Sequence, residues 1–330
     1  MNYSTTPPRG QEQDIVVRFW GVRGSVPSPG PDTARFGGNT SCVSIEGVNA
    51  IDSRPRIGVF DAGTGIRNLG KTIADRDIEI VILLSHVHWD HIQGFPFFSP
   101  IYQAKRNIFF STLEQRHGLF RRLLEQMDGM HFPLTESQLR AHMDHYSDTQ
   151  IEQFVDDGYR VSRIRVNHPG ETYGFRADLR GRSIVYIPDN ELDPPYPPIL
   201  RDATLTAFCR GADVLIHDAQ YIDADMPHKR GWGHSVISRV WELARAARVK
   251  HVVLFHHDPD RTDNELDEIQ AASNAWFAIH APGTRCTVAF EGLELRLTSK
   301  PRPPETKTIL PAESATAPRP RSDREDRSHP

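Results

Sequence analysis

The sequence predicts an α/β fold, and its succession of strands leading to a histidine-rich loop suits the first half of a four-layer αβ/βα sandwich with mixed β-sheets. Short apolar runs rich in β-branched residues recur along the chain and are typical of buried strands, as at residues 78–84 and 251–255. Between such runs, residues 236–248 carry apolar side chains at helical spacing. A chain of 330 residues is long enough to bury the core of one large α/β domain.

Composition restricts the class of protein. Lys and Arg total 39 against 43 Asp and Glu, so the formal net charge of -4 gives no sign of a nucleic-acid partner. The three cysteines form no Cys-x-x-Cys pair, which fits a reducing compartment and argues against a thiolate zinc site. No apolar run is long enough to cross a bilayer, and residues 1–13 lack a signal-peptide core. We therefore expect a cytoplasmic protein without a membrane partner.

The elements follow in a regular order. Strands are predicted at residues 14–21, 37–45, 57–66, 78–84, 161–168, 183–190, 213–221 and 251–259. Residues 92–160 are predicted to form a helical insertion or lid, with helices at 113–127 and 136–145, and a later helix spans 236–248 with Ser235 as its cap. A single domain at 14–298 is flanked by polar, Pro-containing ends at 1–13 and 299–330, which we predict to be disordered because they cannot bury enough apolar surface.

Three histidines and one aspartate lie within six residues, directly after the predicted strand at 78–84. They are His86, His88, Asp90 and His91. Imidazole and carboxylate are ligands that zinc, iron and manganese favour. Since His86 and His88 are two apart in an extended chain, both project to the same side. This stretch therefore predicts a metal site at the end of a strand.

The His-x-His-x-Asp-His pattern resembles the signature of the metallo-β-lactamase superfamily, and the resemblance spans roughly residues 15 to 298. It implies a four-layer αβ/βα sandwich and two metal ions. His86 and His88 would bind one ion, and Asp90 and His91 the other. Two later strand ends supply the further ligands that the resemblance implies, His168 and the bridging carboxylate Asp189. Asp61, in an Asp-x-Gly element, would support the metal-binding loop by hydrogen bonds, although a carboxylate there is also typical of a turn or helix cap.

The resemblance narrows to the branch that contains ribonuclease Z and small cyclic phosphodiesterases. His217-Asp218-Ala219-Gln220 looks like its His-Glu-Ala-Thr element, and Gly233-His234-Ser235-Val236 looks like its Gly-His-Ser-Thr element. By this match His234 is the proton donor and Asp218 orients it. The strand ending in Leu254-Phe255-His256 would make His256 the last metal ligand. The adjacent His257 leaves that assignment open.

These residues predict a binuclear metal-dependent hydrolase with two divalent ions, for which we expect Zn²⁺, with Mn²⁺ or Fe²⁺ as alternatives. A hydroxide bridging the metals would attack a phosphodiester, Asp90 would accept its proton and His234 would protonate the departing alkoxide. The predicted substrate is a cyclic nucleotide or another small phosphodiester. We expect Arg23 and Asn39, in the Gly/Pro-rich loop that begins at residue 22, to contact it.

Other functions stay open at this point. A tRNA 3′-end endonuclease like ribonuclease Z is one alternative, although we find no Gly/Pro-rich basic arm in the sequence. A carboxylic ester or lactone hydrolase is another, and it would not need His234. A catalytically silent sensor module could retain the metals for structure. The resemblance also allows a homodimer, which the sequence does not decide.

Overall fold

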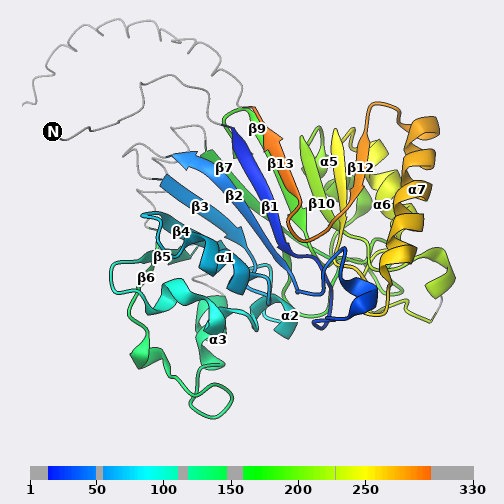
Figure 1. The fold of residues 1–330 in the computed structure, drawn as a ribbon. Helices are drawn as coiled ribbons and strands as arrows, with labels where there is room; N and C mark the ends of the chain where they lie inside the picture. The colour runs from blue at the N-terminus through cyan, green and yellow to red at the C-terminus, as the bar shows by residue number, and fades with distance from the viewer. Residues whose placement is uncertain (1–13, 50–54, 111–117, 147–158, 227, 299–330) are drawn as a thin grey trace, which may run out of the picture.

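The computed structural model describes residues 14–49, 55–110, 118–146, 159–226 and 228–298. The predicted disordered ends at 1–13 and 299–330 lie outside these residues. Two β-sheets lie between two layers of helices (Figure 1), which confirms the predicted αβ/βα sandwich. Within the described ranges, no helix combines the length and apolar character that crossing a bilayer requires.

The first sheet contains seven strands and begins at its edge with β13 (Glu294–Leu297). Next in spatial order come β1 (Ile15–Gly21), β2 (Cys42–Asn49), β3 (Pro55–Phe60), β4 (Glu79–Leu83), β5 (Asn107–Phe110) and β6 (His142–His145). Pairing is antiparallel from β13 to β3 and parallel from β3 to β6. Because parallel strands end at the same edge, the carboxyl ends of β3 and β4 lie together.

The second sheet contains six strands. Their spatial order is β12 (Arg285–Val288), β11 (His251–Phe255), β10 (Val214–Asp218), β9 (Arg182–Ile187), β8 (Tyr173–Leu179) and β7 (Tyr159–Arg165). Strands β7 to β9 pair antiparallel, whereas β9 to β12 pair parallel. Each sheet is thus antiparallel in one part and parallel in the other, and the parallel part of each delivers histidines and carboxylates at its strand ends.

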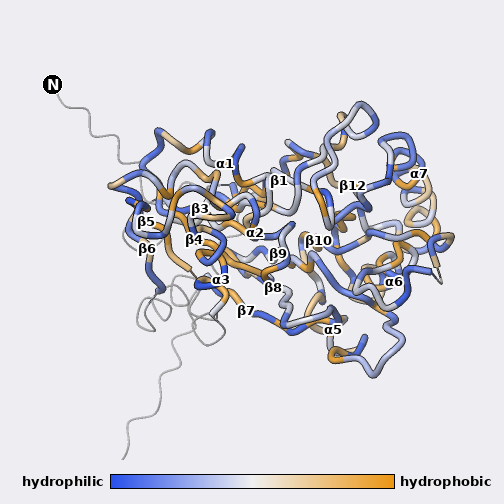
Figure 2. Tube along the Cα trace, turned by 90° about the horizontal axis from the view of Figure 1, so that it is seen from below, coloured by the Kyte–Doolittle hydropathy of each residue, from blue (hydrophilic) through white to orange (hydrophobic). Residues whose placement is uncertain are grey.

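Helices cover the outer face of each sheet. The first sheet is covered by α1 (Ile66–Ile73) and α3 (Leu119–Glu125). The short helix α2 (Trp89–Ile92) lies in the loop after β4. The second sheet is covered by α5 (Asp202–Cys209), α6 (Ile237–Ala246) and α7 (Asp263–His280). Between the sheets, an aromatic-rich core includes Phe60 stacked on Tyr186 with ring centroids 4.8 Å apart. Figure 2 shows hydrophobic segments gathered along the strands and hydrophilic ones mainly in the outer loops. Burial of these faces is the main force that assembles the layers.

The stretch at 92–160 differs from its prediction. Its described part supplies β5 and β6 to the first sheet, so it belongs to the sandwich and is not a helical lid. Residues 136–145 form a short 3₁₀ turn followed by the edge strand β6 instead of a helix, because pairing of β6 with β5 outweighs local helical spacing. The predicted helix at 113–127 is the shorter α3, and residues 113–117 lie outside the described part. The predicted cap of α6 is also wrong, since Val236 is the cap and Ser235 Oγ donates to the carbonyl of Asn190.

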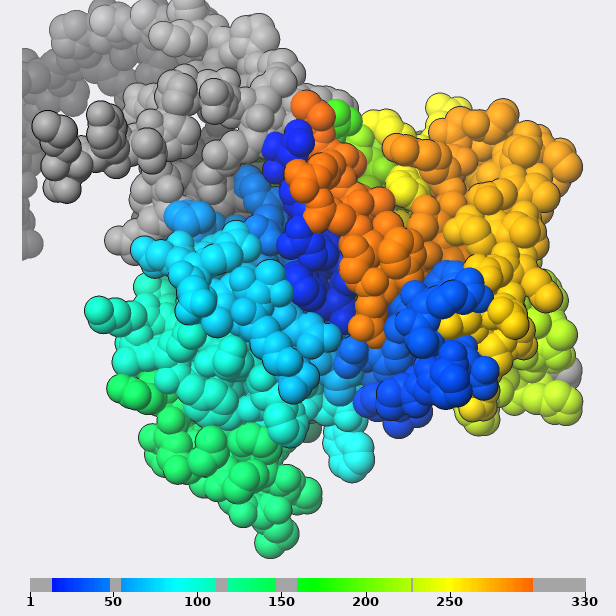
Figure 3. Space-filling view, in the orientation of Figure 1, coloured from blue at the N-terminus to red at the C-terminus, as the bar shows by residue number. Residues whose placement is uncertain are grey.

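The loop that follows β1 packs against α7, far along the chain. The Asp263 carboxylate accepts hydrogen bonds from the backbone N–H groups of Arg35 (2.7 Å) and Phe36 (3.1 Å). Thr262 caps α7 and forms a capping box with Glu265. Figure 3 shows this N-terminal loop, in blue, lying against the yellow and orange C-terminal half of the chain. The loop is thereby fixed across the ends of the parallel strands.

Candidate metal centre

Seven histidine and aspartate side chains from both sheets converge between the strand ends. The loop after β4 contributes His86, His88, Asp90 and His91; the loop between β7 and β8 contributes His168; the ends of β9 and β11 contribute Asp189 and His256. Their ligand atoms form two groups that share Asp189, and within each group all lie within 4.8 Å of one another. The fold therefore brings together every residue that the sequence predicts as a metal ligand.

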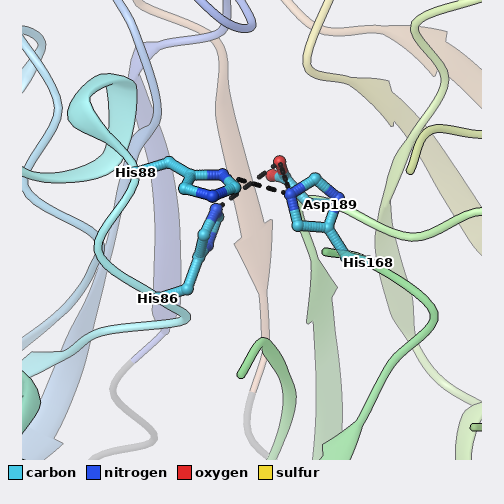
Figure 4. Close-up of side chains that lie close together, drawn as sticks. All are labelled: His86, His88, His168 and Asp189. Carbon is cyan, nitrogen blue, oxygen red and sulfur yellow. Dashed lines mark hydrogen bonds and ion pairs between the residues drawn. The ribbon is translucent and has the colours of Figure 1, made fainter. Parts of the chain in front are cut away.

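The first group, which we call the open group, consists of His86, His88, His168 and Asp189. Figure 4 shows His86 and His88 on one side, facing His168 and Asp189 on the other. Asp189 Oδ2 lies 3.5 Å from His168 Nε2 and 3.8 Å from His86 Nε2. His88 is exposed while the other three side chains are buried, so this group can be reached from solvent on the His88 side.

The second group, the buried group, consists of Asp90, His91, Asp189 and His256. Here Asp189 Oδ1 lies 3.0 Å from His91 Nε2 and 3.3 Å from His256 Nε2. Asp90 Oδ2 lies 3.2 Å and 3.0 Å from the same two nitrogens. Each oxygen of Asp189 thus faces a different group, which is the arrangement expected of a carboxylate that bridges two ions.

The atoms at the centre fit a metal. Among the described residues, His86 Nε2, His91 Nε2 and Asp189 Oδ1 are buried and have no hydrogen-bond partner. Leaving buried polar atoms without a partner is costly, so such atoms require an explanation. All three point into the cluster, and imidazole nitrogens with carboxylate oxygens are the donor set that divalent transition metals accept. The residues of these groups therefore fit a bound divalent metal.

Hydrogen bonds orient three of the imidazoles. His91 Nδ1 donates to Asp61 Oδ2 (2.8 Å), His168 Nδ1 to the carbonyl of Gly233 (2.8 Å), and His256 Nδ1 to Gln220 Oε1 (3.2 Å). In each ring the Nε2 atom is left to face the centre. Such outer partners fix both the tautomer and the direction of a metal-binding histidine.

Asp61 has the supporting contacts that the resemblance implies. Its fully buried carboxylate accepts from the Ser85 backbone N–H (2.7 Å), Ser85 Oγ (2.8 Å), Tyr186 Oη (2.8 Å) and His91. These partners join β3, the loop after β4, and β9. The carboxylate therefore ties the histidine-rich loop to both sheets. Its position is a support for the loop and not a cap of α1, whose N-terminal cap is Gly65.

Backbone strain is concentrated at the same place. Five described non-glycine residues have positive φ, and three of them, Ser25 (60°), Asp61 (58°) and His256 (62°), contact the cluster. The left-handed region is unfavourable for side chains with a Cβ and is held only where surrounding contacts impose it. Ser25 N–H donates to Asp90 Oδ2 (2.9 Å), and a Cβ at the neighbouring Gly24 would collide with the His256 ring. The loop after β1 thus packs directly on the buried group.

Electrostatics favour the metal-binding protonation states of most of these groups. Burial opposes ionisation of Asp90 and Asp189, but nearby imidazoles outweigh it and hold the pKa of both carboxyls well below their usual range. Burial lowers the pKa of His86, which keeps that ring neutral. Burial also opposes protonation of His91, yet Asp90, Asp189 and Asp61 together raise the pKa of His91 well above its usual value. A bound cation would displace this proton, so metal binding there is coupled to proton release.

His234 lies beside the centre with its own carboxylate. His234 Nδ1 donates to Asp218 Oδ2 (3.0 Å), and its ring centroid lies 5.0 Å from that of His256 and 5.2 Å from that of His168. Burial lowers the pKa of His234, but Asp218, together with Asp189 and Asp90, outweighs it and raises the pKa to about 9. The Asp218 carboxylate also accepts from the backbone N–H groups of Asn190 (3.0 Å) and Gln220 (3.1 Å). A protonated imidazole is therefore held next to the candidate metal ligands.

Comparison with known proteins identifies the family. A family model described as a beta-lactamase superfamily domain matches residues 58–257. The chain belongs to this superfamily. The match includes all seven converging side chains, and it confirms the prediction of a metal-dependent hydrolase with a metallo-β-lactamase fold.

The individual relatives share low sequence identity with this chain. Ribonuclease Z from Halalkalibacterium halodurans is 26% identical over 296 residues, covering 74% of this chain and 93% of that protein. Among solved structures, the metallo-beta-lactamase fold protein YhfI from Bacillus subtilis matches with a TM-score of 0.61 at 14% identity, covering 86% of this chain and 100% of that one. A diphosphatase from the PhnP family matches with a TM-score of 0.56 at 18% identity, covering 86% and 98%. The structural matches show the shared fold.

The structure decides between two histidines that the sequence left open. His256 Nε2 faces Asp90 and Asp189, as described above. His257 is buried on the other side of the strand end, where its Nε2 donates to the carbonyl of Ala289 (2.8 Å). Burial lowers the pKa of His257 to about 3, so this ring is neutral. His256 therefore remains the candidate ligand, and His257 is a packing residue in this superfamily member.

The two predicted substrate contacts do not fit the structure. Arg23 is fully buried, and its guanidinium donates to the backbone carbonyls of Gly37, Asp258 and Arg261. Those bonds fix the loop after β1 and leave no face of Arg23 for a substrate. The Asn39 amide donates to Glu291 Oε2 (2.9 Å), while Glu291 Oε1 accepts from the Asn39 backbone N–H. Both side chains hold the loop in place, because a long loop over strand ends needs internal partners for its polar groups.

Three residues that support the site were not identified from the sequence. Gln220 orients His256, although it was visible as the last residue of the His217-Asp218-Ala219-Gln220 element. Ser85 precedes His86 and bonds Asp61. Glu191 follows Asp189 by two residues and accepts hydrogen bonds from the loop that carries His234. Only their contacts across the fold distinguish them from ordinary polar residues, so no local signal in the sequence could have found Glu191.

Proposed function

We propose that this chain hydrolyses phosphodiesters, and that its substrate is a cyclic nucleotide or another small phosphodiester. The observation that carries the proposal is the His234–Asp218 pair beside the two groups that share Asp189. An alkoxide such as a ribose oxygen is a poor leaving group and needs a proton as it departs. A buried imidazole whose pKa is raised to about 9 carries that proton at neutral pH.

The chain's own residues account for the remaining steps. Divalent metal ions held by the two groups would supply a water of lowered pKa and polarise the phosphoryl oxygen. Asp90 is ionised and fixed by Ser25 N–H, so it can accept the proton of the attacking water. Asp218 stabilises the imidazolium of His234 and directs its Nδ1, which leaves Nε2 to deliver the proton to the leaving oxygen.

The similarity to a diphosphatase and to proteins named ribonuclease Z supports chemistry at phosphorus. The identity and number of the metals belong to the same proposal: two ions, with Zn²⁺ expected. The decisive experiment measures metal content by mass spectrometry together with turnover of bis-p-nitrophenyl phosphate and a panel of cyclic mono- and dinucleotides. We expect about two equivalents and turnover of at least one cyclic nucleotide.

A second candidate is cleavage of precursor tRNA at its 3′ end. It is favoured by the similarity over 93% of the length of a ribonuclease Z. The formal net charge of -4 favours a small substrate over the phosphate backbone of an RNA. Metal-loaded protein that cleaves precursor tRNA but turns over no cyclic nucleotide would reverse this preference.

A further inference from the structure

Two exposed tryptophans stand next to the candidate metal ligands. Trp89 lies between His88 and Asp90 and is 79% exposed, and Trp232 directly precedes Gly233 and is 58% exposed. Neither side chain contributes to the core. Large exposed aromatic side chains next to a concave polar site are typical of binding surfaces, because an indole offers a wide apolar face at little cost in entropy.

Both tryptophans border the accessible side of the centre. His88 is the exposed member of the open group, and Trp89 follows it in the chain. On the other side, the His88 and His168 ring centroids are 5.1 Å apart, and His168 Nδ1 donates to the carbonyl of Gly233. Trp232 is therefore one residue from a group that contacts the open ligands. Both exposed indoles are thus carried by residues next in the chain to a ligand of the open group or to its hydrogen-bond partner.

The loop that carries Trp232 is held in one conformation. The buried Glu191 carboxylate accepts from the backbone N–H of Gly231 (2.8 Å) and of Gly233 (3.0 Å), on either side of Trp232. Both glycines have positive φ, 89° and 91°, and a Cβ at Gly233 would collide with His168. The indole is thus presented to solvent by a rigid support.

Positive charge accompanies Trp232. Lys229 Nζ lies 4.6 Å from the Trp232 ring centroid and 5.4 Å from that of Tyr221. Lys229 Nζ also lies 3.9 Å from Asp258 Oδ2, whereas Arg230 is exposed and forms no ion pair with another residue that the structure describes. A planar aromatic face with basic side chains beside it combines the two features that proteins use to bind the base and the phosphate of a nucleotide.

We propose that Trp232, with Lys229 and Arg230, forms a nucleobase-binding subsite, and that Trp89 forms the second border of the same opening. This inference rests on the proposed phosphodiesterase function and narrows its substrate class to phosphodiesters that carry a nucleobase. The base stacks on the Trp232 indole while the phosphodiester reaches the open group. Glu191 is a positioning residue, since it acts through the loop and not on the substrate.

A binding experiment tests the subsite without catalysis. Zinc-loaded protein is titrated with adenosine 5′-monophosphate, and the dissociation constant is measured by calorimetry. Trp232→Ala should raise the dissociation constant about tenfold, because the base loses its stacking partner, and Trp232→Phe should recover most of the affinity. Affinity for inorganic phosphate, which has no base, should change much less. Ile279→Ala is the control, since Ile279 is also an exposed apolar side chain but lies at the C-terminal end of α7.

A kinetic experiment separates the subsite from the proposed function. The ratio of kcat/KM for thymidine 5′-p-nitrophenyl phosphate to that for methyl p-nitrophenyl phosphate should fall about tenfold in Trp232→Ala, mainly through KM. If the native protein hydrolyses neither ester, the proposed function fails, and the titration with adenosine 5′-monophosphate still decides the subsite. Equal affinity of the native protein and Trp232→Ala for the nucleotide would overturn the inference. So would loss of a dimer in light scattering of Trp232→Ala, which would assign the indole to a subunit interface.

Discussion

The open and buried groups share Asp189 but differ in how the fold holds them. In the buried group, His91 and His256 are fully enclosed, and each has a side-chain partner behind it, Asp61 or Gln220. In the open group, His168 is held by a backbone carbonyl and His88 is exposed. The comparison indicates that the fold supports the buried group more firmly and leaves the open group more accessible to solvent.

Removing Asp189 affects both groups and should have the largest effect. Asp189→Ala leaves five imidazoles and one carboxylate, so we expect metal content to fall below one equivalent and kcat to fall by about a thousandfold or more. Mass spectrometry and turnover of bis-p-nitrophenyl phosphate measure the two effects. An Asp189→Ala protein that retained two equivalents would contradict the bridging role.

Removing the proton donor should lower the rate without removing metal. His234→Ala is expected to lower kcat by about a hundredfold to a thousandfold for an alkyl leaving group, and much less for p-nitrophenolate, which departs without a proton. Metal content is the control and should stay at the native value. Similar losses for both leaving groups would show that His234 acts only on the structure of the site.

The dependence of kcat on pH tests the role of Asp218. Burial opposes protonation of His234, but Asp218 raises its pKa, and the donor is active only while protonated. The rate for a poor leaving group should therefore decline as the pH rises through the pKa of His234. Asp218→Asn removes the charge that raises this pKa, so the alkaline limb should move to lower pH. An unchanged limb in kcat against pH would exclude His234 as its source.

A substitution at Gly233 should weaken metal binding by the open group alone. A Cβ at Gly233 would meet the His168 ring, and its φ of 91° is unfavourable for alanine. Gly233→Ala should lower affinity for the more weakly bound metal by about tenfold to a hundredfold. Gly170→Ala is the matched control, since it has a φ of 84° in the same loop as His168 but nothing within 4 Å of the added Cβ. Equal metal affinities in the two variants would contradict the steric explanation.

The smallest effect concerns stability and separates the two groups. In metal-free protein, His91→Ala deprives the buried Asp61 of a hydrogen-bond donor, which costs about 1–3 kcal/mol, whereas His88→Ala changes an exposed side chain and should cost much less. Chemical denaturation of both variants measures the difference. Equal stabilities would show that the buried group is no better supported than the open one.

The local pattern of the sequence was sufficient for much of the site. His86, His88, Asp90 and His91 fall within six residues after a strand, so their chemistry and proximity are encoded together. His168, Asp189 and His256 lie far apart in the chain, and they became candidates because each follows a predicted strand at a position where the resemblance to the superfamily implies a ligand. The prediction of a helix at 136–145 was wrong for the opposite reason. Strand pairing with β5 depends on a partner outside this segment, which the local spacing of apolar residues does not reveal.

The sequence by itself determined the α/β class and the histidine-rich loop after a strand, because these depend on neighbouring residues and on side-chain chemistry, and its resemblance to the superfamily supplied the remaining candidate ligands. Only the tertiary structure decided that His256 and not His257 faces the centre, that Arg23 is buried as a support, and that Glu191 holds the loop of Trp232. The physical reason is that orientation and burial arise from contacts between segments far apart in the chain, and a sequence pattern records only which groups are available to make them.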